Sequence, residues 1–177
     1  ARAPQAPTPE ILSADLTRVA LELAVWGAPG GADLAWIDPP PAPAMEAAHR
    51  TLTHLGLLNG GAGASASPLS ATALGRAVAR IPTEVRLARA LLIARGIMGA
   101  KRAAEATALL STGLRPPGGD LTALARSVRD GGTHTGMWRA EARRLEIGVA
   151  MTLGAAWPLQ TPNTARGTRH AAQELQY

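Results

Sequence analysis

The most regular pattern in the sequence is an apolar stripe that runs along residues 135–156. Its members recur every three or four residues and are Trp138, Ala142, Leu145, Val149, Leu153 and Ala156. This spacing matches the period of an α-helix, so it predicts one long amphipathic helix from Thr135 to Ala156. Such a helix needs neighbouring helices on which to bury its apolar side.

The side chains available for a core favour the same conclusion. The 177 residues include no Phe, one Tyr and four Trp. Leu, Ala, Val, Ile and the tryptophans must therefore fill the interior, and alanine-rich helices pack closely in bundles. A chain of this length buries a core of its own and forms one domain or two small ones. We expect a mainly α fold.

Helix start signals and apolar spacing predict the other elements. Thr8 is expected to cap the first helix, with Pro9 at its first position, and this helix runs to Trp26. Further helices are expected over 41–55, over 70–81 with Ser70 as cap, over 83–98 with Thr83 as cap, over 100–112, and over 120–128 with Asp120 as cap. Two short apolar pieces, at Leu57–Leu58 and Pro68–Leu69, flank a Gly/Ser loop and predict a small β-hairpin.

This order of elements divides the chain into four parts. Residues 1–8 form a flexible leader, and 9–82 (helix, helix, hairpin, helix) form a winged-helix domain. Residues 83–157 form a helical bundle, and 158–177 form an irregular tail. No apolar run is long enough to cross a membrane and the N-terminus lacks the apolar segment of a signal peptide, so a cytoplasmic location is expected.

Catalytic motifs are missing from the sequence. It has no cysteine, no P-loop, no H-E-x-x-H pair and no nucleophile elbow. The histidines at 49, 54, 134 and 170 do not have metal-ligand spacing, and the carboxylates are scattered. We therefore expect no catalytic residue, no metal site and no cofactor in this chain.

The positive charge is carried almost entirely by arginine. The formal net charge is +5, and Lys101 is the single lysine. A guanidinium group matches the geometry of phosphate, so the excess points to a polyanion, although a codon bias toward arginine explains it equally. Tryptophan offers base stacking, but Trp26 and Trp138 fall on apolar stripes and are expected in the core. Trp36 is expected to pack its turn onto the first helix.

The last two predicted helices offer the best nucleic-acid surface. Arg139, Arg143 and Arg144 lie beside the apolar stripe of the long helix, and Arg126 and Arg129 lie on the helix before it. Together they are expected to form a basic wall for a single strand, and a solvated charged face is the alternative. The run 79–92, ARIPTEVRLARALL, gives weaker candidates in Arg86 and Arg89. There, and at Arg76 and Arg80, a solvated face is favoured.

Five short motifs then occur in one order along the first half of the chain. They are Pro9-Glu10-Ile11, Trp36-Ile37-Asp38-Pro39-Pro40, Leu55-Gly56-Leu57-Leu58, Leu69-Ser70 with Gly75-Arg76, and Ile81-Pro82 with Val85-Arg86-Leu87-Ala88. This order resembles the region that follows the motor of bacterial DEAH-box ATP-dependent RNA helicases of the HrpB type. The resemblance covers about residues 6–156 and is most specific over 9–92. Val85 replaces a second proline of the family, and Gly75-Arg76 is shifted by one residue.

The resemblance implies a winged-helix domain followed by a helical-bundle, or ratchet, domain. In the family, the winged helix joins RecA-like motor domains to the bundle, and the bundle forms one wall of the single-stranded RNA channel. ATP and magnesium bind only in the motor domains, which this sequence does not contain, so the chain itself is not expected to be an enzyme. Its expected partners are single-stranded RNA or DNA, bound weakly, and the motor domains.

Two other function classes remain open. The first is a stand-alone winged-helix regulator that reads duplex DNA through residues 70–82. That segment offers only Thr72, Arg76 and Arg80 as base-reading side chains. The second is a protein-interaction scaffold without nucleic-acid binding.

Overall fold

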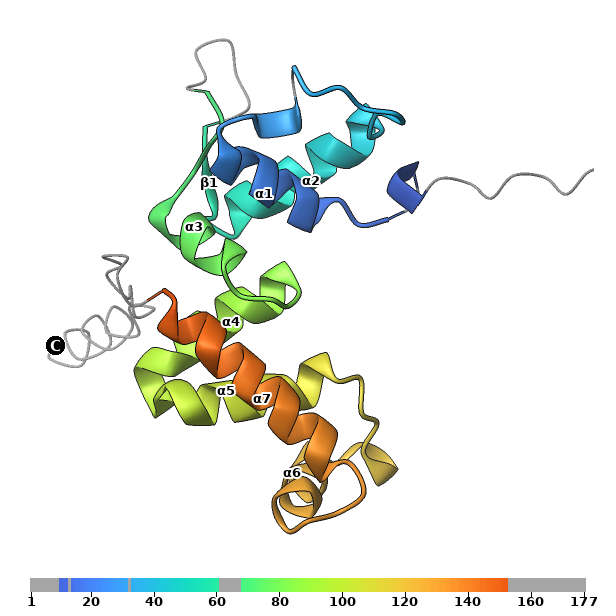
Figure 1. Ribbon diagram of the computed structural model, residues 1–177, viewed down its shortest axis with the longest axis vertical. Helices are drawn as coiled ribbons and strands as arrows, with labels where there is room; N and C mark the ends of the chain where they lie inside the picture. The colour runs from blue at the N-terminus through green and yellow to red at the C-terminus, as the bar shows by residue number, and fades with distance from the viewer. Residues whose placement is uncertain (1–9, 13, 32, 61–67, 153–177) are drawn as a thin grey trace, which may run out of the picture.

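Helices dominate the part of the chain that this computed structural model describes, which is residues 10–12, 14–31, 33–60 and 68–152 (Figure 1). The α-helices are α1 (Thr17–Trp26), α2 (Ala42–His54), α3 (Ala73–Ala79), α4 (Val85–Met98), α5 (Ala100–Ser111), α6 (Leu121–Arg129) and α7 (Thr135–Ala150). Short 3-10 turns occupy Glu10–Leu12, Pro29–Gly31 and Pro117–Gly119. Strand β1 (Leu58–Asn59) pairs antiparallel with β2 (Ser70–Ala71), with Leu58 opposite Ala71. The predicted mainly helical fold with a small hairpin is confirmed.

The helices form two groups, which Figure 1 shows one above the other. In the first group, α1 packs on α2 and α3, and the hairpin lies against α1 and α2. In the second group, α5 packs on both α4 and α7, and α6 contacts α5 and α7. The predicted domain boundary at 82–83 lies in the turn between α3 and α4. Buried residues nevertheless form one continuous core that passes from Val78 and Ile81 to Val85 and Ala88.

The apolar stripe on the last helix is buried as predicted. Trp138, Ala142, Leu145 and Val149 are all buried against the core. Helix α7 ends at Ala150, earlier than expected, and the Thr152 hydroxyl then donates to the Val149 carbonyl at 2.7 Å. The predicted stripe members Leu153 and Ala156, like the predicted tail, lie outside the described residues.

The first helix begins later than the sequence pattern suggested. Glu10–Leu12 is a separate 3-10 turn, and α1 begins only at Thr17. The Asp15 carboxylate accepts hydrogen bonds from the hydroxyl and the backbone N–H of Thr17 (2.9 Å for the latter). These bonds lower the pKa of Asp15, with the hydroxyl as the larger cause. The predicted cap Thr8 and first position Pro9 lie outside the described residues.

The predicted helix caps at Ser70 and Thr83 are wrong. Ser70 is a strand residue paired with Asn59, so the cap of α3 passes to Thr72, whose hydroxyl accepts from the Gly75 N–H at 2.9 Å. Helix α4 begins at Val85 with Glu84, not Thr83, at its N-cap, and within the described ranges no side chain makes a hydrogen bond at that cap. The predicted cap at Asp120 is confirmed by bonds from the N–H groups of Thr122 (2.7 Å) and Ala123 (3.2 Å).

Two of the three tryptophans for which a place was predicted lie as expected, and Trp26 does not. Trp138 is buried, as expected from its place in the stripe. Trp36 is half-buried and donates its indole N–H to the Gly31 carbonyl at 3.0 Å, so it holds the Pro29–Gly31 turn that packs on α1. Trp26 was expected in the core, but its side is turned outward and 82% of the residue is exposed. The buried side of α1 is formed instead by Leu16, Ala20, Leu21, Leu23 and Ala24.

The turn between the two helix groups is held by an arginine from α1. The Arg18 guanidinium donates to the carbonyl oxygens of Ala79 (2.7 Å), Ile81 (2.9 Å) and Thr83 (3.3 Å). Gly148 of α7 lies against the same turn, and a Cβ there would come 3.0 Å from the Pro82 ring. The turn is therefore fixed by helices from both groups.

Over the described ranges, no helix combines the length and apolar character that a bilayer span requires.

Candidate nucleic-acid interface

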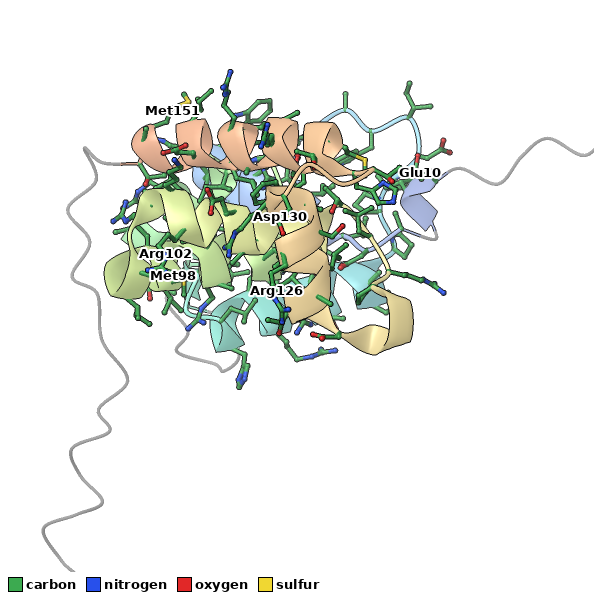
Figure 2. The ribbon with its side chains drawn as sticks, turned by 90° about the horizontal axis from the view of Figure 1, so that it is seen from below. Glu10, Met98, Arg102, Arg126, Asp130 and Met151 are labelled. Atoms are coloured by element: carbon green, nitrogen blue, oxygen red, sulfur yellow. The ribbon has the colours of Figure 1, made fainter. Side chains whose placement is uncertain are left out.

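A groove about 540 Å³ in volume lies where α5, α6 and α7 meet. Its charged lining residues are Lys101 and Glu105 from α5, Arg129 from α6, and Arg139, Arg143 and Glu146 from α7. Trp138 and Ala142 line its floor. Figure 2 shows α7 lying across the other bundle helices, with α6 running away from it at an angle. Three of the five arginines predicted from sequence thus meet at one site.

The helical period explains why Arg139 and Arg143 share this groove. They are four residues apart on α7, so their side chains lie one turn apart on the same face. Trp138 directly precedes Arg139, and Ala142 directly precedes Arg143. Both preceding residues are buried in the core. The arginine row therefore borders the buried stripe, where α5 and α6 approach α7.

The groove carries an excess of positive charge. Four cationic side chains line it against the two carboxylates of Glu105 and Glu146. Arg129 lies 3.8 Å from the Glu105 carboxylate, and 55% of its side chain is exposed. Within the described ranges, Lys101, Arg139 and Arg143 form no ion pair. Three cations are therefore available to an anionic ligand without breaking an existing pair.

Trp138 has a structural role in this groove. Only 5% of the residue is exposed, and its indole N–H donates to the Glu105 carbonyl at 2.9 Å. The bond ties α7 to α5 and orients the backbone from which Glu105 projects. The ring is too enclosed to stack on a base, so the groove suits phosphate contacts.

Arg144 and Arg126 do not join the other three arginines. Arg144 makes two hydrogen bonds of 2.8 Å to the Glu141 carboxylate, which lower the pKa of Glu141 and raise that of Arg144. It lines a separate hollow beside Asp15 and Arg86. Arg126, labelled in Figure 2, is exposed on α6 and is not among the residues that line the groove.

Two arginines near the turn, Arg80 and Arg89, bind backbone carbonyls. Arg89 is half-buried and its Nε donates to the Leu55 carbonyl at 2.9 Å, so α4 is tied to the end of α2. Arg80 donates to the Met151 carbonyl at 3.1 Å, which ties the end of α3 to the end of α7. Arg86 is exposed in the hollow that also contains Arg144. The sequence did not indicate these structural roles, because each carbonyl partner is distant along the chain.

The residues expected of a duplex-DNA reader are engaged within the fold. The Thr72 hydroxyl contacts the Gly56 and Leu57 carbonyls (2.9 and 3.2 Å) as well as the Gly75 N–H. Arg76 donates to the Ala71 carbonyl at 2.6 Å, and Arg80 to that of Met151. Each of the three side chains is thus held by at least one bond within the fold, and this fixed placement does not suit the base-edge contacts of a recognition helix.

Histidines and carboxylates do not gather into a metal site. Among the described residues, no group of three His, Cys, Asp or Glu side chains is placed to hold an ion. His54 and His134 are exposed, and His170 lies outside the described residues. The Nε2 atom of His49 is buried and has no hydrogen-bond partner among the residues that the structure describes. Burial lowers the pKa of this histidine, and the charge of Glu46 opposes the shift.

Comparisons with known proteins agree with the motifs. The chain is 36% identical over 113 residues to the ATP-dependent RNA helicase HrpB of Escherichia coli, a stretch that covers 64% of this chain. A crystal structure of the Escherichia coli DEAH/RHA helicase HrpB superposes over 81% of the chain with a TM-score of 0.64 and 27% identity. The chain is similar to a segment of an HrpB-type helicase. No family model matches the sequence.

The similarity covers a small part of the helicase. The chain spans about 13% of the curated HrpB sequence and 17% of the HrpB chain in the crystal structure. The resemblance to an HrpB-type DEAH helicase is thereby confirmed. The similarity supports a helicase accessory part, and it does not carry over the activity of the whole protein.

Proposed function

We propose that this chain is a non-catalytic accessory region of an HrpB-type RNA helicase. In this proposal, the groove formed by Lys101, Arg129, Arg139 and Arg143 contacts the phosphates of a single strand. The observation that carries it is the meeting of arginines from α6 and α7 in one groove, with a lysine from α5 that forms no ion pair in the described part of the chain. Guanidinium groups suit phosphate oxygens, and a groove lined by cations follows a nucleic-acid backbone.

The N-terminal helix group has a different part in the proposal. Helices α1–α3 and the β1–β2 hairpin act as a winged-helix hub that joins RecA-like motor domains to the bundle. The turn held by Arg18 and Gly148 supports this role, because it joins the two helix groups rigidly. A movement of the hub would then be passed to the groove. ATP and magnesium bind in the motor domains.

A binding comparison tests the proposal. Fluorescence anisotropy at low salt compares a labelled single-stranded RNA with duplex DNA of equal length. We expect weak binding with a preference for the single strand, and an affinity about tenfold lower for Arg139→Ala with Arg143→Ala, which corresponds to about 1.4 kcal/mol. Arg50→Ala with Arg115→Ala is the charge-matched control, since both arginines are exposed and lie outside the groove.

The other function classes give different results in the same assay. A regulator that reads duplex DNA would prefer the duplex. A protein-interaction scaffold would bind neither nucleic acid even at low salt. If the groove variant and its control lose the same affinity, the binding depends on net charge and not on the groove.

A further inference from the structure

Trp26 is a strongly exposed aromatic residue among the described residues. It ends α1 with 82% of its surface exposed, beside Val25, which is 37% exposed. A tryptophan side chain offers a large aromatic face, so an exposed tryptophan beside a groove is a candidate ligand contact. The bundle groove described above does not include Trp26.

Trp26 borders a second groove, about 360 Å³ in volume, between α1 and α3. Its apolar floor is formed by Val19 and Leu23 of α1 and Ala79 of α3, and Arg76 and Arg80 of α3 line the opposite side. One aromatic ring and two cations thus border one shallow apolar surface. We name these residues the α1–α3 groove.

The charge of the α1–α3 groove is positive. Its one carboxylate, Glu22, is bound by the Arg18 Nε at 2.6 Å. Arg76 and Arg80 each use Nη1 for a backbone carbonyl, and within the described ranges neither forms an ion pair. A guanidinium has five N–H donors, so each keeps several for an anion.

We propose that the α1–α3 groove is a second contact site for single-stranded nucleic acid, in which Trp26 stacks on a base and Arg76 and Arg80 bind the adjacent phosphates. A single strand supplies an aromatic face and anionic groups together, and this pairing of ring and cations is typical of proteins that bind it. A polypeptide ligand would need carboxylates opposite both arginines as well as an apolar anchor. The site shares its ligand class with the proposed function and uses none of the bundle-groove residues.

Tryptophan fluorescence tests the stacking directly. Titration of the full chain with a 12-residue oligouridylate should quench emission, because a base stacked on an indole quenches it. Trp26→Phe retains an aromatic face, whereas Trp26→Leu retains only apolar bulk. We expect Trp26→Leu to lose the quenching component and at least about fivefold in affinity, and Trp26→Phe to lose less. Because Trp26 is exposed, both variants should melt like the wild type.

The arginines have a separate test. Arg76→Ala with Arg80→Ala should lower the dependence of affinity on salt, whereas Arg50→Ala with Arg115→Ala should leave it unchanged. Equal affinity and equal quenching in wild type and Trp26→Leu would overturn the second site. So would tight binding of an acidic, leucine-containing peptide that Trp26→Leu preserves, because that result makes the surface a protein interface.

The two proposals fail separately. If Arg139→Ala with Arg143→Ala leaves affinity unchanged while oligouridylate still quenches Trp26, the bundle groove is wrong and the α1–α3 site stands. If the bundle variant loses affinity and Trp26→Leu behaves as wild type, the reverse holds.

Discussion

Arg18 on α1 donates a hydrogen bond of 2.9 Å to the carbonyl oxygen of Ile81, 63 residues further along the chain. The same guanidinium reaches the Ala79 carbonyl at 2.7 Å, so it closes the end of α3 just before the turn into α4. The last carbonyls of a helix lack partners within the helix, and a cation favours that end of its dipole. Arg18 therefore links three segments of the fold at the joint between the helix groups.

Replacement of Arg18 should weaken the whole fold. Arg18→Ala removes the guanidinium donor from the Ala79 carbonyl and one of the two donors from the Ile81 carbonyl, which keeps the Thr83 N–H, and we expect a loss of about 2 kcal/mol in the free energy of unfolding in urea. Arg50→Ala is the control, because Arg50 is exposed and lies 3.9 Å from Glu46. It should change stability by less than about 0.5 kcal/mol. Equal stability of the two variants would show that the joint does not depend on Arg18.

Gly75 should not tolerate a side chain. A Cβ at this position would lie 2.1 Å from the Leu57 carbonyl oxygen, so α3 would have to move away from the hairpin. We expect Gly75→Ala to destabilise the protein by about 1–3 kcal/mol or more, measured by thermal or urea unfolding.

Gly136→Ala is the matched control for that change. Gly136 lies in α7 and a Cβ there meets nothing within 4 Å, so alanine should leave stability unchanged or raise it by about 0.5–1 kcal/mol. A fully stable Gly75→Ala variant would contradict the close packing of α3 on Leu57.

His49 should make stability depend on pH. Its pKa is lowered in the folded state by burial, so below the unfolded value of about 6.5 the unfolded chain binds more protons than the folded one. The free energy of unfolding should therefore keep its full value above that pH and decline as the pH falls from about 7 to 5. Urea unfolding at several pH values should show a smaller decline for His49→Leu than for wild type. An identical decline in both would assign the effect to other groups.

Much of this fold was predictable because its signals are local. The stripe of α7, the Asp120 cap and the hairpin follow from neighbouring residues, and each is found in the structure. The errors arose where a distant contact decides. The hydroxyl that the sequence offers as a cap at Ser70 belongs instead to a strand residue, because Ser70 pairs with Asn59.

The candidate site shows the same limit. Helical spacing places Arg139 and Arg143 on one face, but it does not tell which face α5 and α6 approach. Arg144 follows Arg143 directly and lies three residues after Glu141, a spacing that allows their ion pair, but only the packing of the bundle shows that Arg144 lies outside the groove. The burial of Trp138 was expected from its periodic pattern, and the exposure of Trp26 was not, because the buried side of α1 is turned by about one residue from the predicted stripe.

Arg144 and Arg139 of α7 should therefore contribute differently to RNA binding. Arg144→Ala removes a side chain held by Glu141 outside the groove, so the affinity for single-stranded RNA should stay within about twofold of wild type. Arg139→Ala should lower it by more, because Arg139 lines the groove and has no ion pair in the described part of the chain. Anisotropy titrations of the two single variants make the comparison. A larger loss of affinity for Arg144→Ala than for Arg139→Ala would indicate that RNA binds in the hollow beside Arg86.

The salt dependence of single-stranded RNA binding tests the central claim most directly. The dissociation constant is measured from low to physiological salt for wild type, for Arg139→Ala with Arg143→Ala, and for Arg50→Ala with Arg115→Ala. Each phosphate contact adds about 0.7 to the slope of log affinity against log salt, so the groove variant should flatten the slope by about 1.4. The control should keep the slope of the wild type. Unchanged affinity and slope in the groove variant would contradict the assignment of this groove to RNA.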